Sequence, residues 1–196
     1  MSDGRPTNTP CVTSPVREGT PRVISADLVS YELPAKSARY TFEAETNGVT
    51  TQWTYVSAKP ARQDAPPQNP CMGDLTGDSQ AACRPEPLIF LRYDLGLALD
   101  NTAEAARTHP ITITAYYQDR LAAPPRVTSI KVEAGYDGGT TWHRAATRAA
   151  GTNTFTARIE PPDRKKAPEG VGLRINASDS RGDTVRQTLP MAYGLR

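Results

Sequence analysis

The acidic residues that could bind a cation are concentrated in one short segment of the sequence. Asp74 and Asp78 stand four residues apart among glycine and threonine, and Ca²⁺ takes its oxygen ligands from loops of this kind. A calcium loop also needs a third acidic position and a bidentate glutamate, and neither follows here. We therefore interpret both aspartates as turn residues, with calcium binding as the alternative. Glu43 and Glu45 share one side of a predicted strand, but no base is paired with them.

A serine nucleophile is the second chemistry that the residue types allow. Gly77-Asp78-Ser79 resembles the surroundings of the catalytic serine in chymotrypsin-like proteases. However, Gln80-Ala81 stands where that family has the glycines that form the oxyanion hole. The two histidines of the chain, His109 and His143, both lie in predicted strands. A divergent chymotrypsin-like hydrolase is therefore only a third hypothesis for the function.

The three cysteines predict a disulfide. Cys71 and Cys83 enclose a segment of turn-forming residues that has no periodic apolar face, and closing a loop of this size removes about 3 kcal/mol of unfolded-chain entropy. We predict this bond, and with it an exported protein; two unpaired thiols are the alternative. The histidines lie too far along the chain to complete a metal site with these thiols. Cys11 is left over. No metal and no cofactor is predicted.

The segment Gly135–Trp142 resembles an Asp-box hairpin, S-x-D-x-G-x-T-W, with Gly135 in place of the serine. In such a hairpin Asp137 accepts hydrogen bonds from the turn, Gly139 adopts a positive φ and Trp142 folds back as an apolar plug. These are structural roles and no catalytic role is predicted. Arg181-Gly182-Asp183 spells an integrin-binding tripeptide, but its position between two predicted strands favours a plain β-turn.

Strands are the elements that must position all these residues. Short runs of β-branched and aromatic residues are separated by Pro, Gly, Asn and Asp, and Asn47-Gly48, Asp137-Gly138-Gly139 and Arg181-Gly182-Asp183 predict hairpin turns. Only residues 98–107 allow a helical turn or two. The predicted strands are 22–33, 38–46, 50–58, 87–97, 109–118, 127–136, 140–148, 153–160, 170–178 and 184–195.

Length and composition bound the domain organisation. The chain has 196 residues, with 18 Pro and 14 Gly among them, and we expect an all-β fold of tandem Ig-like or fibronectin-like β-sandwich modules with a disulfide-closed loop. Residues 1–20 are predicted to be a flexible arm or linker. Residues 21–104 form an N-terminal β module with a long loop at 59–86, and residues 105–196 a C-terminal Ig-like β-sandwich.

Charge and hydropathy exclude two kinds of partner. The formal net charge is +2 with both signs interspersed, so no basic field for a phosphate backbone is present. No segment approaches the ~20 apolar residues of a membrane span. The first residues also lack the basic and apolar regions of a secretory signal. We therefore predict neither nucleic-acid binding nor a membrane span.

Four motifs, in order, resemble one family. The hairpin Asp179–Thr188 followed by Ala192-Tyr193-Gly194-Leu195 is similar to the terminal hairpin of actinobacterial secreted subtilisin-like serine peptidases, A-x-D-x-x-G-N-x-V-x-Q-T with A-Y-x-L after it. The upstream matches are Thr51–Ala58, Leu88–Leu95 and Val132–Trp142. The resemblance covers about residues 35–196, and its departures are Asp183 for the usual Asn and Gly135 for the usual Ser.

The resemblance implies a non-catalytic role. In that family this region follows the catalytic domain, and none of the family's triad motifs occurs here, so no catalytic residue is carried over. The resemblance implies a secreted, extracellular accessory region that stabilises or targets the catalytic domain of its own parent peptidase. A protein substrate or a cell-surface glycan is a further partner. The alternative is a free-standing extracellular protein- or glycan-binding module that uses exposed aromatic residues such as Tyr116 and Tyr117.

Overall fold

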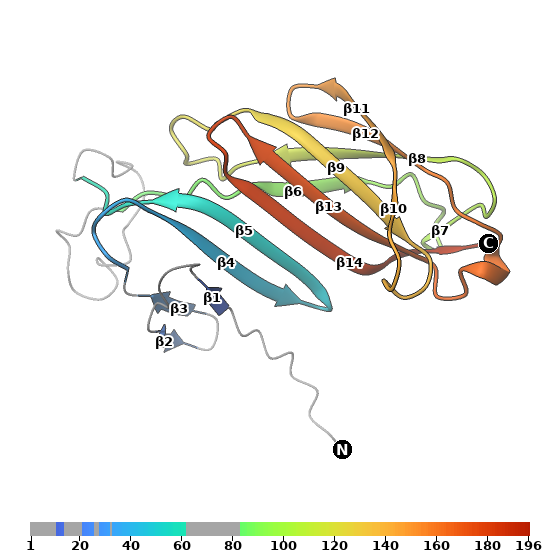
Figure 1. The fold of residues 1–196 in the computed structure, drawn as a ribbon, viewed down its shortest axis with the longest axis horizontal. Helices are drawn as coiled ribbons and strands as arrows, with labels where there is room; N and C mark the ends of the chain where they lie inside the picture. Colours follow the sequence, from blue (N-terminus) through green and yellow to red (C-terminus); the bar gives the residue numbers. More distant parts are fainter. Residues whose placement is uncertain (1–10, 14–20, 26–27, 32, 62–82) are drawn as a thin grey trace, which may run out of the picture.

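The computed structural model describes residues 11–13, 21–25, 28–31, 33–61 and 83–196 (Figure 1). Antiparallel strands dominate this part of the chain and confirm the all-β prediction. The helical structure described is a single short 3₁₀ turn, Arg164–Lys166, and no described helix is long and apolar enough to cross a membrane. The strands are β1 Cys11–Thr13, β2 Pro21–Ser25, β3 Leu28–Tyr31, β4 Ala38–Thr46, β5 Val49–Ser57, β6 Phe90–Asp94, β7 Thr102–Ala103, β8 His109–Tyr116, β9 Val127–Gly135, β10 His143–Arg144, β11 Ala146–Gly151, β12 Thr154–Ile159, β13 Val171–Asp179 and β14 Thr184–Leu195.

The strands form two main sheets that face each other. The larger sheet has the order β1-β4-β5-β14-β13-β9-β10, with β7 added beside β14, and the smaller sheet has the order β11-β12-β8-β6. A separate two-stranded sheet joins β2 and β3. In Figure 1 the β4–β5 hairpin extends the larger sheet beyond the smaller one.

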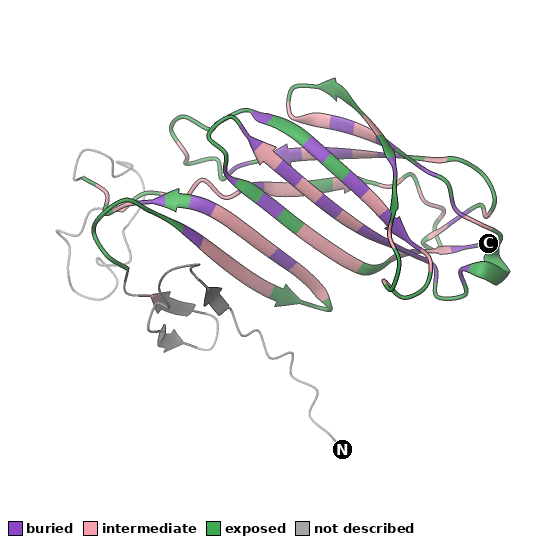
Figure 2. Cartoon of the chain, in the orientation of Figure 1, coloured by how far each residue is buried: buried purple, intermediate pink, exposed green. Residues whose placement is uncertain are grey.

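One hydrophobic core fills the space between the two main sheets. Burial alternates along β9, β13 and β8, as expected for strands with one face on a core, and Figure 2 shows this alternation along the larger sheet. Burying each large aliphatic side chain of this kind contributes about 1.5–3 kcal/mol. The core includes Ile111, Ile113, Phe155 and Ile159 from the smaller sheet and Val132, Leu173, Ile175 and Val185 from the larger one.

Two of the predicted hairpins are present as expected. Asn47 and Gly48 have φ values of 52° and 76°, the positive pair that a type I′ turn requires, and they join β4 to β5 in a regular ladder. Gly182 has a φ of 79° in the turn between β13 and β14. Local turn residues therefore set the pairing of these four strands.

The third predicted hairpin is shorter than expected. After the Asp137 turn, only His143 and Arg144 pair with β9, and the chain then crosses to the smaller sheet as β11. Ala145, at the crossing, is buried and donates its N–H to the carbonyl oxygen of Val132. The predicted single strand 140–148 is therefore wrong, because burial of Ala145 turns the chain from one sheet to the other.

Three other expectations are corrected. The predicted strand 22–33 is split into the paired strands β2 and β3. Residues 98–107 hold a turn, with Asn101 at a φ of 59°, and the short strand β7 in place of a helical turn. The predicted arm 1–20 contains β1, which pairs with β4; the rest of the arm lies outside the described residues.

Strand pairing crosses the predicted module boundary near residue 104 in both main sheets. β5 pairs with β14 in the larger sheet, and β6 pairs with β8 in the smaller one. The strands of the two predicted modules therefore belong to the same two sheets and share the same core.

Candidate functional site

Several of the sequence-predicted site residues lie outside the described part of the chain. These are Asp74, Asp78, Ser79 and Cys71, all within 62–82. Cys83 is described and is disulfide-bonded, so the pairing of Cys83 with Cys71 stays a prediction. Within the described residues, no group of three or more His, Cys, Asp and Glu side chains could hold a metal ion.

The two histidines make structural contacts. Nε2 of His109 lies 2.7 Å from the carbonyl oxygen of Leu95, and the His109 ring lies 5.2 Å from the buried ring of Tyr193. His143 stacks on Tyr136 at a centroid distance of 5.5 Å. The structure therefore places the two histidines in separate aromatic contacts.

The Asp137 turn shows how the hairpin residues are held. Both carboxylate oxygens of Asp137 accept from the N–H of Thr141, at 2.9 and 3.1 Å, and Oδ2 also accepts from the Thr141 hydroxyl at 2.6 Å. These hydrogen bonds favour the carboxylate and lower the pKa of Asp137. Gly138 and Gly139 have φ values of 67° and 86°. The Asp137 carboxylate thus stabilises its own turn by accepting hydrogen bonds from Thr141.

Trp142 is held between this turn and the sheet. A Cβ atom at Gly135 would lie 3.3 Å from the Trp142 ring, and one at Gly139 would also lie 3.3 Å from it. On the sheet, the guanidinium of Arg174 lies 4.1 Å from the ring centroid, in a cation–π contact. Glycine at 135, where the Asp-box has serine, therefore leaves room for the indole.

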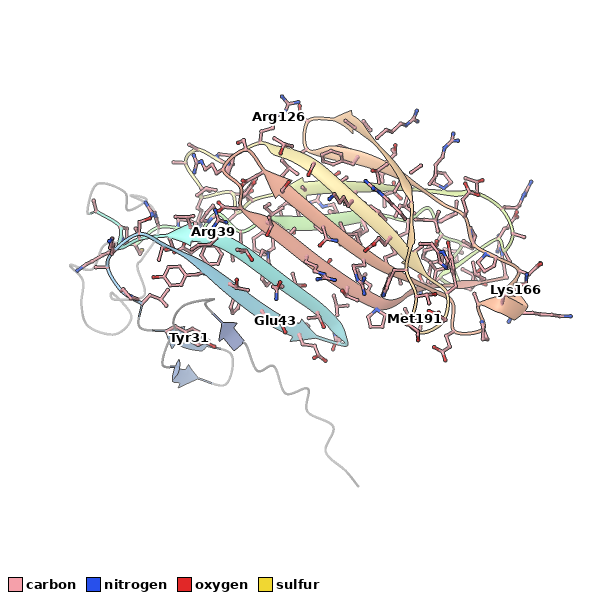
Figure 3. All side chains as sticks on the ribbon, in the orientation of Figure 1. Tyr31, Arg39, Glu43, Arg126, Lys166 and Met191 are labelled. Carbon is pink, nitrogen blue, oxygen red and sulfur yellow. The ribbon has the colours of Figure 1, made fainter. Side chains whose placement is uncertain are left out.

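The Arg181-Gly182-Asp183 turn keeps its carboxylate inside the protein. Asp183 is 3% exposed, and its Oδ1 accepts from the N–H of Val56 in β5 at 3.1 Å. Arg39, labelled in Figure 3, donates to the carbonyl oxygen of Gly182 at 3.0 Å. The side chain of Arg181 donates to Ala123 at 3.2 Å. These contacts favour a structural turn over an integrin ligand.

A buried polar cluster lies where the β4–β5 hairpin meets the segment before β6. The hydroxyl of Ser57 donates to Oε1 of Glu86 at 2.6 Å, while Oε2 of Glu86 and the hydroxyl of Tyr40 are buried with no described partner. Burial is the main cause of the raised pKa of Glu86, and the Asp183 charge adds to it. Burial, with Glu86 nearby, also raises the pKa of Tyr55 to about 12.

Tyr116 is exposed and Tyr117 is buried, so the prediction that both contribute to an exposed aromatic binding surface is wrong for Tyr117. Tyr117 is 7% exposed, and its hydroxyl donates to Oδ2 of Asp179 at 2.9 Å, so Tyr117 is a core residue. Tyr116 is 41% exposed, with the Phe90 ring 5.6 Å away and the Arg92 guanidinium 5.4 Å from its ring centroid. Of these two tyrosines, Tyr116 is the one that a partner could contact.

An aromatic row continues from Tyr116 and Phe90 to the β4–β5 hairpin. Trp53 lies 6.1 Å from Phe90 and stacks on Phe42 at 5.4 Å, and its Nε1 donates to the carbonyl oxygen of Ile89 at 2.8 Å. Since the ring faces of Phe42 and Trp53 cover each other, these residues join the hairpin to the sandwich and do not form an open platform.

Tyr116 belongs to the outer face of the smaller sheet, which is here called the cationic face because it carries three exposed arginines. Inward-facing Ile111, Ile113 and Ala115 leave the alternate residues of β8 on the outside. The alternation of apolar and polar residues along β8 predicts an outward face. Which residues of β6, β11 and β12 share that face follows only from the register of all four strands. The cationic face consists of Phe90, Arg92, Asp94, Pro110, Thr112, Thr114, Tyr116, Ala146, Arg148, Thr154, Thr156 and Arg158.

Comparison with known proteins gives no relative: no protein-family model and no curated protein matches this chain.

Proposed function

We propose that this chain is the non-catalytic accessory β-sandwich region of a secreted subtilisin-like serine peptidase, which stabilises or targets the catalytic domain. Strand order is the observation that carries the proposal. β6-β8-β12-β11 and β14-β13-β9-β10 correspond to the orders A-B-E-D and G-F-C-C′ of an Ig-like sandwich. Such sandwiches are common in extracellular accessory modules, and the motifs that resemble the peptidase family lie on β5, β6, β9, β13 and β14.

The hydrogen bonds of three aspartates support the same function. Asp137, Asp179 and Asp183 accept hydrogen bonds from backbone N–H groups of turns and strands, which is the pattern of groups that fix a scaffold. A disulfide at Cys83 supports an oxidising, extracellular location. We assign its partner as Cys71, which would close the loop between the hairpin and β6.

Purified chain gives the first test. We expect no hydrolysis of fluorescent casein and no labelling by a fluorophosphonate probe, which reacts with activated serines. Hydrolysis that a serine-directed inhibitor blocks would overturn the proposal. Loss of that hydrolysis in Ser79→Ala would then support the chymotrypsin-like hypothesis.

The reading frame upstream of residue 1 gives the second test. We expect it to encode an export signal and a subtilisin-type Asp, His and Ser triad. If that frame encodes neither, the accessory role is wrong and the free-standing binding module takes its place. The exposed Tyr116 beside Arg92 favours this second function.

A further inference from the structure

The cationic face carries three arginines on one side of a four-stranded sheet. Arg158 faces outward from β12, Arg148 from β11 and Arg92 from β6, and all three are exposed. The register puts Arg148 opposite Thr156 and Arg158 opposite Ala146, so the two arginines are diagonal neighbours. Diagonal pairs of this kind are about 7–8 Å apart. Two guanidinium groups can therefore reach the same bound molecule.

These guanidinium groups have no carboxylate partner in the described part of the chain. The ion pairs found there are Arg39–Asp183, Arg107–Glu104 and Arg174–Glu133. Arg148 donates from Nε to the Thr156 hydroxyl at 3.1 Å, and Arg92 lies over Tyr116.

The acid on the cationic face is already engaged in its own turn. Asp94 accepts at Oδ1 from the N–H of Gly96 at 3.2 Å. The face therefore carries three guanidinium groups and one carboxylate, which is an excess of positive charge.

The outer face of the larger sheet is different. There, Glu43 accepts from Gln52 at 3.0 Å, and Glu133 lies 3.7 Å from Arg174. Lys131 and Arg186 lie in the same cross-strand row as Glu43. Charges of both signs therefore stand side by side on that face, whereas the cationic face holds three arginines and one acid.

The centre of the cationic face is polar and carries hydroxyl groups. Thr112 and Thr114 of β8 lie opposite Thr156 and Thr154 of β12. A protein partner would need an apolar anchor at the centre of its interface, and here the aromatic residues, Tyr116 and Phe90, stand together at one end. Threonine hydroxyls with arginines beside them and an aromatic ring at one end suit a sugar chain.

We propose that the cationic face binds an acidic polysaccharide, a chain of uronic-acid type. Arginine pairs with carboxylates through two parallel hydrogen bonds, so Arg148, Arg158 and Arg92 contact the uronate groups. Threonine hydroxyls donate to and accept from sugar hydroxyls, and the Tyr116 ring packs against the C–H face of one pyranose. The inference deepens the targeting role of the proposed function and rests on it, but binding is measured on this chain by itself.

The experiment measures binding of the full chain to polygalacturonate by isothermal titration at low salt. We expect saturable binding that weakens in 0.5 M NaCl. The double variant Arg148→Gln/Arg158→Gln lowers the affinity about tenfold or more, since two charge-assisted contacts are lost. The matched control, Lys131→Gln/Arg186→Gln, removes the same charge from the outer face of the larger sheet and changes the affinity less than about twofold.

Three outcomes overturn the inference. One is the absence of binding to polygalacturonate, and another is an equal loss of affinity in the two double variants. The third is tighter binding of polyglutamate, which would assign the face to acidic polypeptides. Tyr116→Ala should weaken binding with little change in the salt dependence, and each variant is checked by its melting temperature. Failure here leaves the casein and reading-frame tests untouched, so the two proposals fail separately.

Discussion

Glu86 and Asp183 bring two carboxylates into the junction between the β4–β5 hairpin and the sandwich. Burial raises the pKa of each, and for Asp183 the neighbouring Asp179 is the next cause. Oδ1 of Asp183 accepts a hydrogen bond from the N–H of Val56, whereas Oε2 of Glu86 has no described hydrogen-bond partner. A charge on Glu86 therefore costs stability that an uncharged side chain of the same shape does not.

The prediction for Glu86→Gln is a gain in stability that depends on pH. A raised pKa means that the folded state binds the proton more tightly than the unfolded chain, where the pKa of glutamate is about 4.3. The contribution of Glu86 to the free energy of unfolding is thus greatest below that pH and is lost as pH rises through the raised pKa. At pH 7.5 we expect the variant to be more stable than wild type, because the neutral amide removes the charge that burial disfavours.

Urea denaturation between pH 4 and 8 measures this effect. Glu45→Gln, at an exposed position of β4, is the control and should show no comparable gain at high pH. A Glu86→Gln variant that is less stable than wild type at pH 7.5 would contradict the inference that the folded state disfavours the charged form of Glu86.

At this scale, distance along the chain decided what the sequence could predict. Asp137 is bound by a residue four positions away, so its turn could be expected from the local motif. Asp183 meets Val56 across 127 residues and Glu86 meets Ser57 across 29. No local pattern encodes those contacts, so the sequence does not predict either of them.

Among the elements, the β13–β14 ladder depends on a glycine where its register shifts. The shift lies between Val171 and Leu173, and a Cβ atom on Gly172 would lie 2.6 Å from the carbonyl oxygen of Pro190. That oxygen belongs to the backbone directly after Leu189, which pairs with Leu173, so it can move aside only if this part of β14 shifts.

Gly172→Ala is therefore expected to destabilise the protein by about 2 kcal/mol or more, within the range of overpacked cores. Gly151→Ala is the matched control, because Gly151 also stands at a register shift but its Cβ would meet nothing closer than 3.7 Å. Urea midpoints with unchanged slopes measure both variants. Equal urea midpoints for Gly172→Ala and Gly151→Ala would contradict the predicted steric clash at residue 172.

The sequence predicted most strands but not the order of strands within the sheets. β4 matches its predicted bounds, and Asn47-Gly48 identified its partner β5. The pairing of β5 with β14 joins residues more than a hundred positions apart, and only packing of the two hairpins on one core selects it. For the same reason the exposed arginines of β6, β11 and β12 could not be assigned to one face in advance.

At the scale of the whole molecule, the shared sheets predict a single unfolding transition. Both predicted modules contribute strands to both main sheets, so we expect the hairpin and the sandwich to lose their pairing together. The two tryptophans report on the two regions, Trp53 on the hairpin and Trp142 on the Asp137 turn.

Single-tryptophan variants test this cooperativity. Trp142→Phe leaves the fluorescence of Trp53, and Trp53→Phe leaves that of Trp142. Within each variant, we expect the remaining tryptophan and the far-UV circular dichroism to give the same urea midpoint, as a two-state transition requires. A Trp53 signal that changes at lower urea than the circular dichroism of the same variant would show that the hairpin unfolds as a separate module.

The position of β14 within the larger sheet has a mechanical consequence. β14 is flanked by β5 on one side and β13 on the other, and hydrogen bonds between antiparallel strands run perpendicular to the strand direction. A pulling force applied beyond Leu195 along β14 therefore loads both ladders in shear, so that many bonds must break together before the strand slides. Pulled from this end, the chain is a resistant anchor point rather than a strand that peels away bond by bond.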